Sequence, residues 1–138
     1  MVERLEKIHR WLWYERATMI TGVSYVFGKT VWTRGILFDN KREVYEYEAK
    51  LHDEDTPAGI NRGRIVCLKL HRVRCGNKGI SSEPVAHFNA EEWSLYPGTL
   101  SGKKIVGLII PKLETLPKSS SAQYRRRREF ILKATYSF

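Results

Sequence analysis

The longest run of like charge in this sequence is four consecutive arginines near its C-terminal end. A guanidinium group pairs with phosphate or carboxylate oxygens, often through two hydrogen bonds at once. Two lysines flank the run, and two further arginines stand in the loop sequence GINRGR. The candidate binding residues are therefore Arg125, Arg126, Arg127, Arg128, Lys118, Lys133, Arg62 and Arg64. We expect them to contact phosphate or carboxylate oxygens, which gives affinity without reading a base sequence.

The charge of the whole chain agrees with this interpretation. The sequence has 24 Lys and Arg against 15 Asp and Glu, a net charge of +9. Residues 111–138 contain seven basic and two acidic side chains, a local charge of +5. Such a surplus predicts a polyanionic partner, either nucleic acid or a host protein complex that binds nucleic acid. The alternative is that the charge only keeps a small protein soluble.

Metal chemistry is not expected from the cysteines and histidines. Cys67, His71 and Cys75 are spaced by four residues, which would align them on a helix. Their segment is rich in β-branched residues and is expected to be a strand, in which they would span about 26 Å. That is too far for one zinc ion, and we predict neither a metal nor a cofactor.

Nuclease chemistry is the enzyme alternative. Asp39, Glu48 and Lys50 have the outline of the D…E-x-K pattern of metal-dependent restriction-type nucleases. Two carboxylates would hold Mg²⁺, and the lysine would steady the attacking water. Those nucleases use a mixed sheet with a crossover helix, for which the short connections here leave little room. We therefore favour a protein that is not an enzyme.

The composition predicts a single globular domain. A hydrophobic content of 42% in 138 residues is enough to bury a core and excludes wholesale disorder. No apolar stretch approaches the roughly 20 residues needed to cross a bilayer. The N-terminal sequence is interrupted by charge every few residues, so it lacks the apolar core of a signal peptide. Two cysteines are too few for a disulfide scaffold, and we expect a cytoplasmic protein that does not bind membranes.

Two kinds of periodicity predict the elements. Leu5, Ile8 and Leu12 recur with helical spacing, so a helix is expected over about residues 3–18, ending before Gly22. The segments after it are rich in β-branched and aromatic residues, which favours strands. We expect strands over residues 23–27, 31–38, 42–51, 64–75, 85–88 and 103–110, with a hairpin turn at Asp39–Arg42.

The C-terminal segment alternates apolar and polar residues from Phe130 to Phe138, which predicts a final strand. The predicted fold class is α+β: an N-terminal helix packed on a mainly antiparallel sheet or half-barrel of about six or seven strands. The single domain, 1–138, would comprise the helix, a β-rich body over about 19–112, and a basic segment with the last strand over 113–138. If Arg126 and Arg128 share the buried face of Phe130, they must lie beyond the covered sheet or pair with acids such as Glu91 or Glu92.

The central block, VYEYEAKLHDEDTPAGINRGRIVCLKL (residues 44–70), resembles a small domain family of bacteriophages and prophages. The shared pattern is an aromatic-x-A-K strand, an acidic turn, the motif G-I-x-x-G-R-I and a following K-L. The matching residues are Tyr47, Ala49, Lys50, Asp53, Glu54, Gly59, Ile60, Gly63, Arg64, Ile65, Lys69 and Leu70. The family has no established activity, so the resemblance implies only a context, that of a phage-borne accessory protein.

Charge and context together lead to one preferred function and two alternatives. We expect a non-catalytic phage protein that binds nucleic acid or a nucleoprotein complex through a basic surface. In a host bacterial cell, such a protein would act against defence systems, for example as an inhibitor of a CRISPR–Cas effector. The first alternative is the nuclease described above. The second is a phage structural or assembly protein that associates through its sheet edges and aromatic residues.

Overall fold

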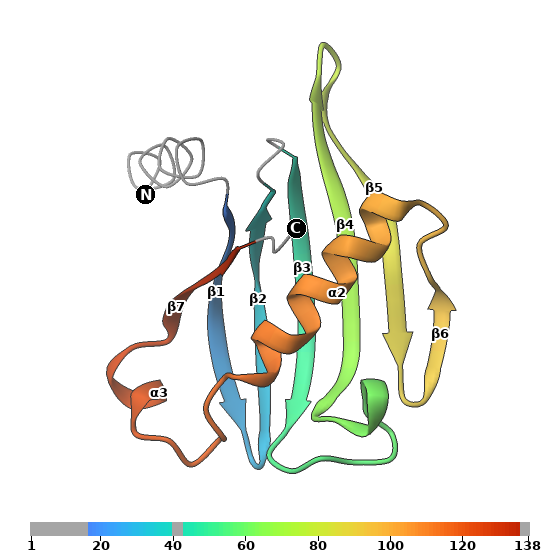
Figure 1. Ribbon diagram of the computed structural model, residues 1–138. Coiled ribbons are helices and arrows are strands. Elements are labelled where there is room, and N and C mark those ends of the chain that lie inside the picture. The colour runs from blue at the N-terminus through green and yellow to red at the C-terminus, as the bar shows by residue number, and fades with distance from the viewer. Residues whose placement is uncertain (1–16, 40–42, 136–138) are drawn as a thin grey trace.

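The computed structural model describes residues 17–39 and 43–135, apart from the side chains of residue 17 and residues 133–135. The described residues form one seven-stranded sheet with the order β6-β5-β4-β3-β2-β1-β7, in which every neighbouring pair is antiparallel (Figure 1). The strands are β1 (Ala17–Phe27), β2 (Thr30–Phe38), β3 (Val44–His52), β4 (Ile65–Gly76), β5 (Gly79–Asn89), β6 (Glu92–Leu95) and β7 (Glu129–Thr135). The helical segments are the 3₁₀ turn η1 (Ile60–Arg62), α2 (Leu100–Glu114) and the single turn α3 (Gln123–Arg126).

The first six strands form a meander in which each strand pairs with the next along the chain. Tight connections permit this order: Gly28, between β1 and β2, has a φ of 61°, a left-handed conformation that glycine adopts without strain. Between β2 and β3, the amide of Asp39 donates to the carbonyl of Glu43, which agrees with the predicted hairpin. Residues 40–42 at its tip lie outside the described residues.

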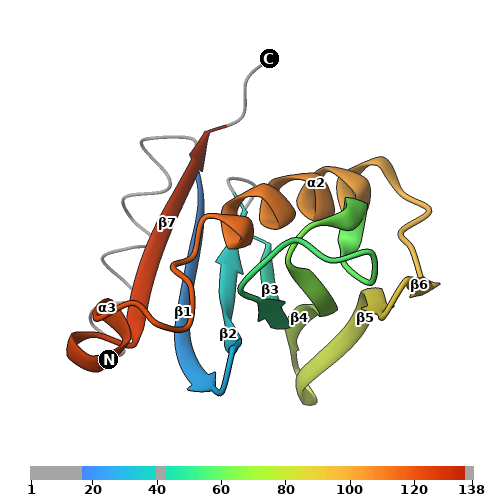
Figure 2. The same ribbon diagram turned by 90° about the horizontal axis from the view of Figure 1, so that it is seen from below.

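Helix α2 lies diagonally across one face of the sheet, and no described element covers the opposite face (Figures 1 and 2). The Thr99 side chain caps the helix by accepting a hydrogen bond from the amide of Gly102 at 3.1 Å. Ile105, Ile109 and Leu113 recur every four residues and are fully buried against the sheet. The core therefore lies between α2 and the face of the sheet that carries Tyr47 and Leu70.

The strand predicted over residues 103–110 was wrong, because this segment forms most of α2. Periodicity alone cannot distinguish a short apolar run in a buried helix from one in a strand. The deciding features are the Thr99 cap and the apolar sheet face, which needs a cover. The alternation of Tyr45, Tyr47, Ala49 and Leu51 on one face of β3 is confirmed, since all four are buried under α2.

The predicted fold class, α+β with an N-terminal helix, is also wrong. The described residues form a mainly β fold, with α2 as its one long helix. The predicted helix over about 3–18 falls largely outside the described residues, and its last two positions belong to β1 instead. Gly22, expected to follow a helix, lies in the middle of β1 and pairs with Gly35 of β2 and Phe130 of β7.

The final strand is confirmed as β7, although residues 136–138 lie outside the described part. It pairs antiparallel with β1, at the opposite edge of the sheet from β6. The chain therefore leaves β6, crosses the sheet as α2 and returns at the far edge. This crossing places the residues between α2 and β7, arginines included, at the edge formed by β7 and by the last residues of β1, which extend past the start of β7. We call this the β1 edge.

The close approach at Gly22 generates a stability prediction. A Cβ at this position would lie 2.3 Å from the Tyr47 hydroxyl and 2.5 Å from the Phe130 ring. Because these side chains would have to shift, we expect Gly22→Ala to lower the free energy of unfolding by about 1–3 kcal/mol. Urea denaturation measures the change.

Gly107→Ala is the matched control. This glycine is an exposed position within α2, and a Cβ there would have no neighbour within 4 Å. Alanine should raise the free energy of unfolding by about 0.5–1 kcal/mol, since it favours the helix. Equal effects of the two substitutions would contradict the packing that attaches β7 to β1 through Phe130.

Candidate nucleic-acid interface

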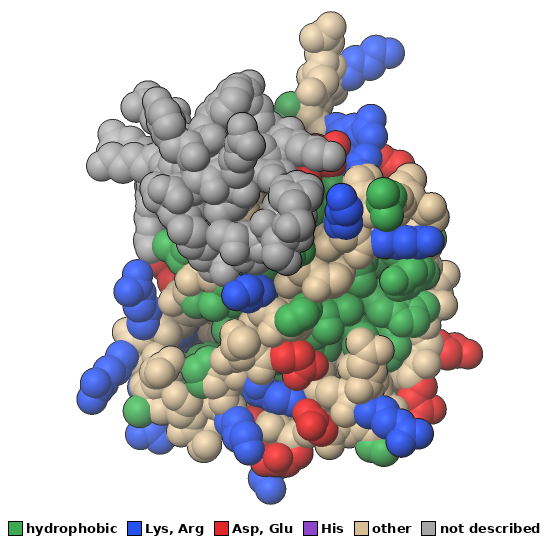
Figure 3. Space-filling view, viewed as in Figure 1, with side chains coloured by type: hydrophobic (Ala, Val, Ile, Leu, Met, Phe, Trp, Pro, Cys, Tyr) green, Lys and Arg blue, Asp and Glu red, His purple; other side chains and the backbone are tan. Residues whose placement is uncertain are grey.

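The four arginines Arg125–Arg128, called here the arginine cluster, lie between α3 and the start of β7. Arg125 and Arg126 end α3, Arg127 is extended, and all four side chains are exposed. The segment is held in place, because the amide of Ser24 donates to the carbonyl of Arg128 at 2.9 Å. Figure 3 shows Lys and Arg side chains along the left side of the molecule, the side on which Figure 1 places α3. The arginine cluster therefore has a defined position at the β1 edge.

The acidic partners predicted for Arg126 and Arg128 are not near them. Glu91 and Glu92 lie at the turn between β5 and β6, at the opposite edge of the sheet. Strand β7 begins only at Glu129, so both arginines precede the covered sheet and face solvent. Of the two expected alternatives, the arginines therefore lie beyond the part of the sheet that α2 covers, and they do not pair with Glu91 or Glu92.

Three arginines of the cluster border a pocket of about 240 Å³ between the α2–α3 connection and β7. Arg126, Arg127 and Arg128 line it together with the rings of Tyr124 and Phe130. The Tyr124 hydroxyl donates to the carbonyl of Pro117, and burial raises the pKa of Tyr124 to about 12. The pocket thus has a neutral aromatic wall and a rim of three arginines and one carboxylate, that of Glu129.

The three remaining candidates are spread over the molecule. Lys118 forms an ion pair with Glu54, with 2.6 Å between Nζ and Oε1, so part of its charge is already neutralised. Arg62 is exposed on η1, apart from α3 in both ribbon views (Figures 1 and 2). Lys133 lies in β7 at the position opposite Met19 of β1. The predicted set therefore does not form one continuous patch, and the arginine cluster is its compact part.

Arg64 is buried, and its side chain serves the fold. Its guanidinium donates to the carbonyls of His52 at 2.8 Å, Glu114 at 3.0 Å, Leu116 at 2.6 Å and Pro117 at 3.4 Å. Only 8% of the residue is exposed. The prediction that Arg64 contacts a partner's phosphate does not fit this geometry, because its donors are already paired within the protein.

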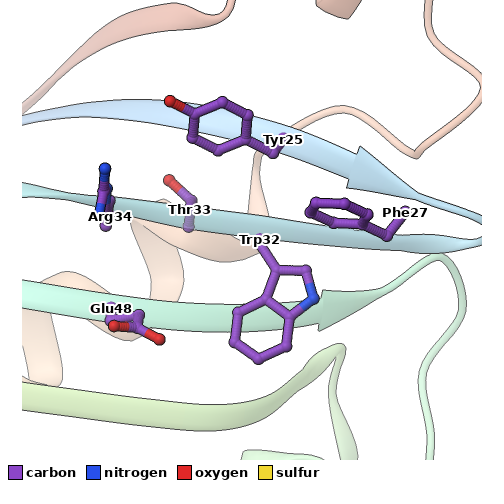
Figure 4. Close-up of a pocket in the computed structure, with 6 residues that line it drawn as sticks. All are labelled: Tyr25, Phe27, Trp32, Thr33, Arg34 and Glu48. Atoms are coloured by element: carbon purple, nitrogen blue, oxygen red, sulfur yellow. The ribbon is translucent and has the colours of Figure 1, made fainter.

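Sequence reasoning missed a group of aromatic side chains on the face of the sheet opposite α2, called here the open face. Tyr25 and Phe27 alternate on β1, and the register places Tyr25 opposite Trp32 of β2. They line a shallow pocket of about 350 Å³ with Arg34 and Glu48 (Figure 4). We call it the aromatic groove. The strand alternation was visible in the sequence, but which face α2 would cover was not, because α2 itself was interpreted as a strand.

Cations lie over two of these rings. The guanidinium carbon of Arg128 is 5.7 Å from the centre of the Tyr25 ring, and Nζ of Lys50 is 5.3 Å from that of Trp32. Both distances are within the range of cation–π attraction. Arg128 therefore links the arginine cluster at the sheet edge to the aromatic groove on the open face.

The nuclease constellation is not assembled. Glu48 stands opposite Arg34 in the register of β3 and β2, and Asp39 lies five residues farther along from Arg34. Five extended residues span about 17 Å, whereas ligands of one Mg²⁺ ion must lie about 2 Å from it. Asp39 and Glu48 therefore cannot hold the same ion in this fold.

Among residues 17–39 and 43–135, no group of three His, Cys, Asp or Glu side chains could hold a metal ion. Cys67, His71 and Cys75 lie along one extended strand, as the sequence predicted. His71 instead meets His87 of β5, with 2.8 Å between their Nε2 atoms. One ring must donate a proton to the other, so the pair needs at least one neutral imidazole.

The chain matches no protein-family model, no curated protein and no solved structure. Comparison with known proteins therefore assigns it to no family. The resemblance of residues 44–70 to a phage family therefore stays a prediction. None of the helices in the described part of the chain has the length and apolar character needed to span a membrane.

Removing the Arg64 side chain should destabilise the fold. Arg64→Ala would leave the carbonyls of the α2 C-terminal end without their buried donors, and we expect a loss of about 3 kcal/mol in the free energy of unfolding. Arg64→Lys should recover only part of it, since an ammonium cannot replace the planar fork. Urea denaturation measures both. Arg62→Ala, an exposed neighbour, should change stability by less than about 0.5 kcal/mol, and equal losses at the two positions would contradict the structural role of Arg64.

The histidine pair generates a pH prediction. Burial lowers the pKa of His87, and the nearby His71 and Lys69 lower it further. The unfolded chain, with a histidine pKa of about 6.5, then binds protons that the folded state resists, so stability should fall as the pH drops below about 6.5. His87→Gln should reduce this loss. Urea denaturation at several pH values between 5 and 8 would show it as a shallower pH dependence, and an unchanged slope would exclude His87 as its source.

Proposed function

We propose that this chain is a non-catalytic protein that binds nucleic acid, or a nucleoprotein complex, through the arginine cluster. The observation that carries the proposal is the placement of Arg125–Arg128. Four exposed guanidinium groups are held on one short segment whose backbone is bonded to β1 at Ser24. A fixed set of cations loses less conformational freedom on binding a polyanion than a flexible tail would.

The electrostatics support phosphate as the bound group. Guanidinium groups bind phosphate oxygens through paired hydrogen bonds. Each phosphate that a protein neutralises releases condensed counterions, so affinity from such contacts falls steeply with added salt. The net charge of +9 adds a long-range attraction that would speed association.

The narrower proposal is that the protein is a phage accessory factor acting in the cytoplasm of a bacterial host. It rests on the resemblance of residues 44–70 to a phage domain family. In that setting, a basic protein with a fixed cluster of arginines suits inhibition of a nucleic-acid-dependent defence complex, such as a CRISPR–Cas effector. Affinity capture from host lysate, with and without nuclease treatment, tests this: recovery of such an effector supports it, and recovery of nucleic acid alone contradicts it.

The arginine cluster can be tested by substitution. Replacing Arg125–Arg128 with alanine should weaken nucleic-acid binding at least tenfold at low salt. It should also reduce the slope of log affinity against log salt by up to about 3, because up to four phosphate contacts are lost. Fluorescence anisotropy with a labelled oligonucleotide, measured over a range of salt concentrations, gives both quantities.

A matched control removes the same charge elsewhere. Arg74, Lys78, Lys103 and Lys104 are exposed, lie outside the arginine cluster and are not among the candidate binding residues. Their combined replacement by alanine should leave the affinity within a few-fold of the parent, since only the long-range attraction is reduced. If both quadruple variants weaken binding equally, net charge explains the affinity and the cluster is not the site.

A further inference from the structure

The aromatic groove on the open face is an unusual feature for a protein surface. Phe27 is 63% exposed and Tyr25 is 36% exposed, although both lie within a regular strand. Trp32 is half-buried beside them, and the three rings lie over neighbouring strands (Figure 4). Exposed apolar side chains that gather in one place, bordered by charge, mark an interaction site more often than scattered ones do.

We propose that the aromatic groove binds single-stranded nucleic acid by stacking bases on Tyr25, Phe27 and Trp32, with the phosphates held by Arg128 and its neighbouring cations. This inference rests on the proposed function and adds the form of the nucleic acid and the place where it lies. Stacking on aromatic rings is open only to bases that are not already stacked and paired within a duplex.

The spacing of the rings fits successive bases. Tyr25 and Phe27 are two residues apart on one face of β1, which separates their Cα atoms by about 6.8 Å. Trp32 lies directly opposite Tyr25, at a cross-strand Cβ separation of about 5 Å. An extended single strand separates its bases by a similar distance, so two or three bases could reach rings in this groove without folding back.

The cations lie where a backbone beside those bases would pass. The guanidinium of Arg128 lies over the Tyr25 ring at the β1 edge, and the ammonium of Lys50, on β3, lies over the Trp32 ring. Arg34 lines the groove between them. A base can replace either cation over its ring, after which the released cation can pair with the adjacent phosphate. The groove thus offers both contacts that sequence-tolerant single-strand binding uses.

The carboxylates of the open face limit the path of the strand. Glu48 lines the groove, but the register places it between Arg34 and Lys69, which offset its charge. Glu46 stands opposite His71, farther from the rings along β3 than Glu48. Glu129 stands opposite Val23 on the β1 side, but the four arginines that precede it leave this side with a net positive charge. Phosphates should therefore follow the β1 side, toward Arg128 and the arginine cluster, rather than cross β3.

Binding of matched oligonucleotides tests the inference. The probes are a labelled single strand of about 12 nucleotides, as DNA and as RNA, and the DNA duplex of the same sequence. The parent should bind the single strands at least tenfold more tightly than the duplex. The variant Tyr25→Val/Phe27→Val/Trp32→Val replaces the rings with a β-branched residue, which also favours strands. It should lose tenfold or more of its single-strand affinity while its duplex affinity changes less than about twofold.

Trp32 provides a second measurement that does not depend on the triple variant. Its fluorescence should be quenched when a base stacks on it, and this part of the quenching should be lost in Trp32→Phe, measured at an oligonucleotide concentration that saturates the variant by anisotropy. Circular dichroism checks that each variant keeps its sheet. Because the chain has three other tryptophans, the test is the difference between the two proteins: quenching as large in Trp32→Phe as in the parent contradicts stacking at this position.

The outcomes separate the two proposals. A parent that binds no oligonucleotide at low salt overturns both the proposed function and this inference. A parent that binds single strand and duplex equally, or a triple valine variant that binds the single strand like the parent, overturns the groove and leaves the arginine cluster standing. Loss of single-strand preference in the valine variant, with duplex binding through the cluster retained, supports both.

Discussion

The guanidinium of Arg64 joins three segments that chain order keeps apart. It donates to the carbonyl of His52 at the end of β3 and to three carbonyls, those of Glu114, Leu116 and Pro117, where α2 ends. The Glu114 carboxylate accepts in return from the amides of Arg64 and Ile65, at the start of β4. A positive charge also suits the C-terminal end of a helix, where unpaired carbonyls give a partial negative charge. The end of α2 is thereby fixed to the end of β3 and the start of β4.

The position of the α2 end determines the path of the chain from α2 to β7. From Pro117 the chain must reach the far side of β1 before β7 can pair there, and Asp53 guides it by accepting from the amide and hydroxyl of Ser119. The Tyr124 hydroxyl donates a hydrogen bond to the carbonyl of Pro117 and so attaches α3 to this connection. Arg64 and the arginine cluster therefore belong to one arrangement: a buried arginine fixes the path that brings the exposed arginines to the β1 edge. The two roles of arginine differ only in whether the guanidinium donates to buried backbone carbonyls, as in Arg64, or faces solvent, as in the arginine cluster.

Sequence patterns anticipated the elements whose residues alternate strictly. The buried face of β3 and the strand at Phe130–Thr135 followed from a period of two, and β4 from its β-branched content. They could not identify α2, because the run from Ile105 to Ile110 is apolar at almost every position and fits either period. Misassigning α2 had consequences for the site. Without a helix across one face, no pattern could show which side of β1 and β2 faces away from α2, and so Tyr25, Phe27 and Trp32 were not singled out.

The same limit explains why sequence patterns could not distinguish the buried Arg64 from the exposed Arg128. Both stand next to glycine or polar residues in basic stretches, and composition gives them equal weight as phosphate contacts. What separates them is long-range: Arg64 meets residues about fifty positions away, whereas Arg128 meets the Tyr25 ring at the sheet edge. An arginine whose guanidinium lies over an exposed ring keeps its N–H donors available to a partner, because the ring contact uses the face of the group and not its edge. That combination, an exposed cation beside exposed aromatic rings, joins the β1 edge and the open face into one continuous surface, and it is on this surface that we propose a single strand binds.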